Sequence, residues 1–184
     1  MNQNILKESE NLLSKIVSEN EDPFGLVDHV REVVRWSSRL IKKFPEADEE
    51  ITLLGAWLHD VGHYPITQED HAITGEKRAK EFLEENNYPQ DKMSKVLHCV
   101  RSHRCKDVMP ETIEARIVAF SDSASHLTGS LYLDMLRKGM LEVMDKLERD
   151  FRDLDIFPDI KKELEPLYES WKKLLREMIG VGEA

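Results

Sequence analysis

Residues 48–64 read DEEITLLGAWLHDVGHY and contain the most hydrophobic helix predicted in this chain. Positions 51–58 are apolar on nearly every side, and a helix that is apolar all round lies inside a protein. Asp48 opens the helix, and the two glutamates after it suit the positive end of the helix dipole. Gly62 and Pro65 mark its end. The sequence therefore predicts a buried central helix.

Helical periodicity continues on both sides of this segment. The further segments expected to be helical are 5–18, 27–44, about 74–86, about 89–103, 110–127, 128–155 and 159–179, the last two regions holding two or three helices. No segment has the pattern of a strand, and no internal repeat is present. The predicted fold class is all-α, a bundle of seven to nine helices.

A length of 184 residues suits one domain, or one domain with a helical appendage. We expect a single domain over residues 1–184, with a core at about 24–130 and a C-terminal helical extension at 131–184. Cys99 and Cys105 fit no zinc spacing, and reduced thiols are expected.

The charge balance restricts the partners of this chain. There are 26 Lys and Arg residues against 36 Asp and Glu, a net charge of −10, which disfavours binding to nucleic acid. A small phosphorylated substrate stays compatible, because a bound divalent cation inverts the local field. No segment approaches the roughly 18 apolar residues of a membrane span, and the polar N-terminus is not a secretory signal. A cytoplasmic protein without membrane partners is expected.

The anomaly of the central helix is the pair His59–Asp60 at its end. A carboxylate there costs several kcal/mol unless a cation or hydrogen bonds compensate it. His29 lies in another apolar stripe, and Asp122 follows the apolar run RIVAF. Three predicted helices thus each present a metal-type ligand toward the interior. Imidazole and carboxylate ligands suit zinc, manganese, iron or nickel.

The order His, His–Asp, Asp resembles the HD-domain superfamily of metal-dependent phosphohydrolases. The matching segments are DHV at 28–30, LLGAWLHDVGH at 53–63 and IVAFSD at 117–122, within a similarity over about 26–130. The resemblance implies a compact multi-helix HD-domain bundle. It also implies that a divalent metal is bound by His29, His59, Asp60 and Asp122.

Two further segments resemble the dinuclear members of that superfamily. HAITGEKRAKEFL at 71–83 is similar to their His-x-x-x-Gly segment, and VLHCVRSHR at 96–104 to the later helix that supplies another histidine. By this resemblance His71 and His103 would bind a second metal, with Asp60 as the bridge. The implied cofactor is one or two divalent ions of Mn, Fe, Zn, Ni or Co.

The resemblance implies hydrolysis of a phosphate ester or anhydride in a nucleotide or a similar small metabolite. The metal would bring the pKa of a bound water from about 15.7 to roughly 7. Asp60 would position that water, and His63, where related families often have Lys, could protonate the leaving group. The candidate phosphate-binding residues are Lys77, Arg78, Arg101, Arg104 and Lys106.

Two other functions stay open on the sequence. Some HD proteins with the same ligand set are di-iron oxygenases, and a non-catalytic nucleotide-sensing module would keep the same pocket. A zinc protease is disfavoured, because HDVGH has an aspartate where the HExxH helix needs the longer glutamate. The Leu and Met residues at 131–144 belong to the core or to an oligomer interface, so a homodimer is also an open expectation.

Overall fold

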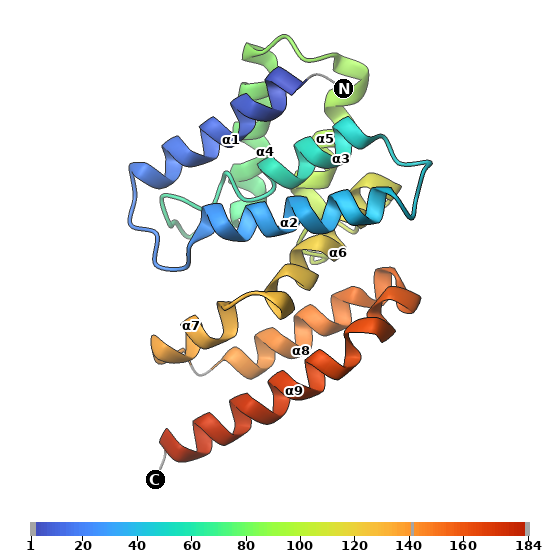
Figure 1. The fold of residues 1–184 in the computed structure, drawn as a ribbon. Helices are drawn as coiled ribbons and strands as arrows, with labels where there is room; N and C mark the ends of the chain where they lie inside the picture. Colours follow the sequence, from blue (N-terminus) through green and yellow to red (C-terminus); the bar gives the residue numbers. More distant parts are fainter. Residues whose placement is uncertain (1–2, 141, 183–184) are drawn as a thin grey trace. The chain divides into compact units, whose positions relative to one another are not determined.

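Every regular element is helical among the residues that this computed structural model describes, 3–140 and 142–182. The first six helices are α1 (Gln3–Ser18), α2 (Leu26–Ile41), α3 (Glu49–Leu58), α4 (His71–Glu85), α5 (Gln90–Ser102) and α6 (Ile113–Thr128). The others are α7 (Leu131–Arg137), α8 (Val143–Asp153), the short 3₁₀ helix η1 (Leu154–Ile156) and α9 (Pro158–Gly182) (Figure 1). The predicted all-α fold class is confirmed.

Backbone contacts divide the chain into two compact units, residues 1–122 and residues 123–184. The border falls within α6, whereas the sequence analysis placed the end of the core at about residue 130. Periodicity could not find this border, because one uninterrupted helix crosses it. The single-domain organisation expected for residues 1–184 stays a prediction.

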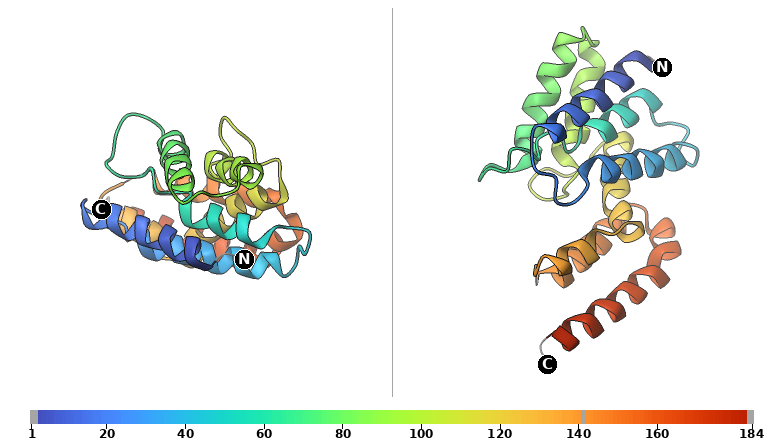
Figure 2. Two further views of the ribbon diagram at one scale, coloured as in Figure 1. Left: turned by 90° about the horizontal axis from the view of Figure 1, so that it is seen from above. Right: turned by 60° about the vertical axis from the view of Figure 1, so that its left-hand side comes forward.

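Helix α3 lies at the centre of the first unit and contacts α1, α2 and α5, while α4 packs along α5. Figure 2 shows α3 between the α1–α2 pair and the α4–α5 pair. The α3–α5 contact is close because Gly55 has no side chain, and a Cβ there would lie 2.6 Å from Cβ of Cys99. All residues from Ile51 to Leu58 are buried except Trp57, so the predicted central helix is confirmed.

The two ends of α3 place Asp48 and the His–Asp pair. At the start, the Asp48 carboxylate accepts hydrogen bonds from the backbone N–H groups of Glu50 and Ile51, at 3.0 and 3.2 Å. This satisfies donors that have no partner within a helix. At the other end the helix stops at Leu58, so the His–Asp pair stands where the chain turns out of the helix.

The turn after α3 and the start of α4 are in close contact. A Cβ on Gly62 would lie 2.2 Å from the backbone nitrogen of Gly75 and 2.2 Å from the carbonyl oxygen of His71. No side chain fits at this position. Helix α4 begins at His71, ahead of the predicted start near residue 74, because Asp70 caps it by accepting the N–H of Ala72 at 3.0 Å.

The second unit contains α7, α8 and α9, with α8 packed against both of the others. Its interior holds the carboxylate of Asp150, with Tyr132 and Lys146 as hydrogen-bond donors. His126 lies 3.1 Å from the same carboxylate. In the described part of the chain, no helix combines the length and the apolar character needed to cross a membrane.

Candidate metal centre

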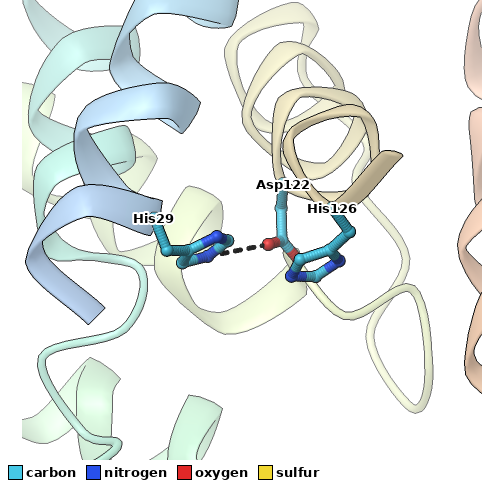
Figure 3. Close-up of side chains that lie close together, drawn as sticks. All are labelled: His29, Asp122 and His126. Carbon is cyan, nitrogen blue, oxygen red and sulfur yellow. Dashed lines mark ion pairs between the residues drawn. The ribbon is translucent and has the colours of Figure 1, made fainter. Parts of the chain in front are cut away.

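Four predicted ligands from three helices meet in the first unit. His29 is on the first turn of α2, His59 and Asp60 follow the last residue of α3, and Asp122 is on α6. His29 Nε2 lies 3.3 Å from His59 Nε2, 3.2 Å from Asp122 Oδ1 and 3.6 Å from Asp60 Oδ2. Figure 3 shows the ion pair of His29 with Asp122; His126 follows Asp122 by one turn of α6.

A second group of ligand atoms surrounds the other oxygen of Asp60. His71 opens α4, and His103 directly follows α5. Their Nε2 atoms are 3.2 Å apart, and they lie 3.3 Å and 3.5 Å from Asp60 Oδ1. One carboxylate therefore lies between two pairs of imidazole rings.

The protonation of the rings is set by backbone hydrogen bonds. His59 Nδ1 lies 2.8 Å from the carbonyl oxygen of Ala56, and His103 Nδ1 lies 2.7 Å from that of Val100. A carbonyl only accepts, so Nδ1 donates in each case, and Nε2 of a neutral ring keeps a lone pair. Burial lowers the pKa of His103 to about 4, which makes this ring neutral at pH 7.

Asp60 is a buried carboxylate that lacks a conventional partner. It is 7% exposed, and among the described residues no group donates a hydrogen bond to its Oδ1. Burial opposes ionisation, but the histidines around it outweigh burial and hold the pKa of Asp60 below its ordinary value. His103 is neutral at pH 7 and adds no positive charge there, so a divalent cation beside the carboxylate would stabilise the anion further.

The residues present fit divalent ions. Ligand atoms about 2.1 Å from a cation, in tetrahedral or octahedral geometry, lie roughly 3.0 to 3.4 Å from one another. The separations in both groups are close to that range. His29, His59 and Asp60 form one group of atoms that could hold an ion, and Asp60, His71 and His103 form another. Asp122 adds an oxygen to the first group.

His63 borders a small pocket beside the second group. The pocket has a volume of about 200 Å³ and is lined by Gly62, His63, Ile66, Thr67, Glu69, Asp70, His71 and Arg104. His63 Nδ1 is buried and has no hydrogen-bond partner among the described residues. Its ring packs edge-on against those of Tyr64 and His71, with centroids 5.0 and 5.3 Å away.

Two of the predicted phosphate-binding residues form ion pairs near the surface. Lys77 Nζ lies 2.9 Å from Glu69 Oε1, and the Arg101 guanidinium is paired with the Asp107 carboxylate. Neither of them lines the pocket. Their role in binding phosphate stays a prediction.

Two more of the five predicted phosphate-binding residues, Arg78 and Arg104, are more enclosed. Arg78 donates to the carbonyl oxygens of Val61 and Tyr64, at 2.8 and 2.5 Å, so it ties α4 to the turn after α3. Arg104 lines the pocket and donates to Asp70 at 2.5 Å. Its hydrogen bond overcomes the effect of burial and lowers the pKa of Asp70 to about 2.

Asp70 and Gly62 are the residues of this region that sequence reasoning missed. Asp70 could have been found from its place before a helix, because Asp is a preferred N-cap residue. Gly62 was noted as a helix end, but its contact with α4 depends on the tertiary packing. His98, a further histidine of α5, accepts the backbone N–H of Glu111 at 3.0 Å.

Comparison with known proteins identifies the family of this chain. A family model described as HD domain matches residues 26–126, more than half of the chain. The chain belongs to the HD-domain family. This confirms the resemblance seen in the sequence, and the matched segment of the HD domain includes all six residues of the two groups.

Two individual proteins are similar to this HD domain. A tRNA (cytidine(56)-2'-O)-methyltransferase of Picrophilus torridus is 28% identical over 158 residues, which cover 78% of this chain and 41% of that protein. The chain thus spans about two fifths of that relative. The crystal structure of a predicted HD superfamily hydrolase from an uncultured Thermotogales bacterium has 18% identity and a TM-score of 0.59. The similarity covers 90% of this chain and 92% of the other, and it shows a shared fold.

Proposed function

We propose that this HD domain is a metal-dependent phosphohydrolase, which cleaves a phosphate ester or anhydride in a nucleotide or a similar small phosphorylated metabolite. One observation carries the proposal: the buried Asp60 carboxylate faces His29 and His59 with one oxygen, and His71 and His103 with the other. The name of the Thermotogales protein, a predicted hydrolase of the same fold, is consistent with this reaction class. Methyl transfer is not proposed, because the similarity covers 41% of the methyltransferase.

The ligand sets follow from the two groups of atoms. His29, His59, Asp60 and Asp122 would hold one divalent ion, and Asp60, His71 and His103 would hold a second. Such ions, of Mn, Fe, Zn, Ni or Co, lower the pKa of water toward neutrality and stabilise charge that develops on phosphoryl oxygens. Asp60, fixed between the rings, positions the attacking water.

The pocket supplies the remaining chemistry. His63 borders the pocket, so its ring could give a proton to the oxygen of the leaving group. Arg104 also lines the pocket, and its positively charged guanidinium suits a phosphate group. A volume of about 200 Å³ accommodates a phosphoryl group and part of its leaving group.

The test begins with elemental analysis of the purified protein. The chelator-stripped protein is then reloaded with Mn²⁺, Co²⁺ or Ni²⁺ and assayed for phosphate release from monoesters, diesters and nucleoside polyphosphates. Metal-dependent turnover that is lost in Asp60→Ala and kept in Asp48→Asn supports the proposal. Asp48→Asn is the matched control, because Asp48 is also an ion-paired aspartate of the first unit, at the other end of α3.

The same experiment separates the two alternatives. Two bound irons and oxygen-dependent turnover without phosphate release would favour an oxygenase. A sensing module would be favoured if no phosphate ester is turned over while Asp60→Ala folds and still binds a nucleotide. Either result would overturn the proposed hydrolysis.

A further inference from the structure

We propose that the ion pair of Asp70 with Arg104 is a positioning clasp that sets the affinity of the second cation site. The inference rests on the proposed two-ion centre and concerns residues outside its ligand set. Asp70 directly precedes His71, and Arg104 directly follows His103. The pair therefore connects the two segments that present the histidines of the second site.

The clasp connects the beginning of α4 to the end of α5. Arg104 Nη1 donates to Asp70 Oδ2, and Lys106 Nζ lies 3.6 Å from the same oxygen. The other oxygen of Asp70 accepts the N–H of Ala72 and so caps α4. The Asp70 side chain therefore has two roles. One oxygen caps the first turn of α4, and the other holds that turn close to the segment after α5.

His71 depends on this support more than His103 does. The ring of His103 is oriented by its hydrogen bond to the carbonyl oxygen of Val100 and is 2% exposed. The ring of His71 is 26% exposed, and in the described residues its Nδ1 has no such acceptor. The position of His71 is therefore set by the backbone at the start of α4, where Asp70 acts.

Breaking the clasp should weaken the second ion and spare the first. Loss of an outer partner of a metal ligand typically reduces metal affinity by 10- to 100-fold. The first site lacks this dependence, because none of its ligands adjoins the clasp in sequence. Asp70→Asn is the sharpest variant, since Asn caps a helix as well as Asp does and only the negative charge is lost.

The experiment is a calorimetric titration of the chelator-stripped protein with Mn²⁺ alone. The parent should bind two ions, and His103→Ala identifies which binding step belongs to the second site. Asp70→Asn and Arg104→Gln should each weaken that step by about 10- to 100-fold, with the first step within about threefold of the parent. The double variant should be no weaker than the worse single variant, because both changes remove one interaction.

The matched control is the ion pair of Asp48 with Lys92, at 2.9 Å, which likewise joins a helix-capping aspartate to a cation of α5. Asp48→Asn should change thermal stability and leave both Mn²⁺ steps unchanged. Parental binding of the second ion by both clasp variants, equal weakening by Asp48→Asn, or a parent that binds one ion would overturn the clasp. Two parental Mn²⁺ steps without turnover of any phosphate ester would overturn the hydrolase and leave the clasp intact.

Discussion

In the described residues, each unit of this protein buries an aspartate among titratable side chains, and the two carboxylates have opposite surroundings. Asp150, 2% exposed in α8, receives hydrogen bonds from Tyr132 at 2.9 Å and from Lys146 at 2.6 Å. Burial opposes its ionisation, but His126 and Lys146 hold the pKa of Asp150 below its ordinary value. Asp60 is buried to a similar degree and receives no donor at Oδ1 from the described residues.

The difference lies in the neighbours. Around Asp150 a tyrosine hydroxyl and an ammonium group donate, so the anion is satisfied by the protein alone. Around Asp60, the Nδ1 atoms of His59 and His103 each donate to a backbone carbonyl, and the Nε2 atoms of the same rings lie 3.6 and 3.5 Å from the carboxylate. A buried anion among acceptors is stable when a cation joins them. The predictions below test this contrast.

The largest effect is expected from removing the carboxylate of the first unit. Asp60→Ala should lower the metal-dependent hydrolysis rate by about 10³-fold or more, because it removes a ligand of both ions. Metal content by elemental analysis should fall with the rate. Asp150→Ala is the comparison variant, and its folded fraction should bind as much metal as the parent. A metal-free but fully active Asp60→Ala protein would contradict the contrast.

The second effect concerns stability. Asp150→Ala should lower the free energy of unfolding by about 3 kcal/mol, since it leaves Lys146 and Tyr132 unpaired in a buried site. Urea denaturation measures the change, with Asp155→Asn as the control. Asp155 pairs with Lys161 at an exposed position, and its loss should cost less than about 1 kcal/mol. Equal destabilisation by both variants would mean that the Asp150 cluster has no special role.

The gain in stability on adding metal should also differ between variants of Asp60 and of Asp150. At an Mn²⁺ concentration 100 times the Kd of one site, binding at that site should add about 2.7 kcal/mol to the stability of the parent over the chelator-treated protein. Asp150→Asn should have a lower stability without metal but gain as much from Mn²⁺ as the parent does. Asp60→Ala should gain little stability from Mn²⁺. Thermal melts with and without chelator provide the measurement. A full gain in Asp60→Ala would place the ion elsewhere.

The smallest effect is a pH dependence of the second unit. Burial raises the pKa of Asp153 to about 6, with a further contribution from Asp150. Because the folded state holds this proton more tightly than the unfolded state, the stabilisation is complete below pH 4 and is lost as the pH rises through 6. Asp153→Asn should remove this slope and stabilise the protein at pH 7 by on the order of 1 kcal/mol. Urea melts at pH 4 and pH 7 test it, and an unchanged slope would contradict it.

Local sequence patterns were enough to predict most of the fold. The apolar run before His59 predicted a buried helix, and the capping role of Asp48 could be inferred from its position. The start of α4 was missed because Asp70 acts through a single side-chain hydrogen bond that has no periodicity. The division within α6 was missed because it depends on contacts between distant segments.

Less of the candidate site than of the fold could be predicted from the sequence. His29 and Asp122 stood out as polar residues on apolar helices, whereas His71 and His103 were identified through resemblance. The sequence could not show that the two oxygens of Asp60 face different histidine pairs, or that Arg104 pairs with Asp70, because residues far apart in the chain meet there.

The contact at Gly62 has a consequence for which ions this centre accepts. The turn after α3 packs closely on the first turn of α4, and the Thr74 hydroxyl donates to the carbonyl oxygen of Gly62 at 3.0 Å, so moving His71 away from Asp60 would break this hydrogen bond. The hydrogen bond and the close packing limit the separation of the two segments, and we expect ionic radius to influence which ions bind. We expect calcium, which prefers six to eight oxygen ligands at 2.3–2.6 Å, to bind this histidine-rich centre more weakly than the smaller transition metals do.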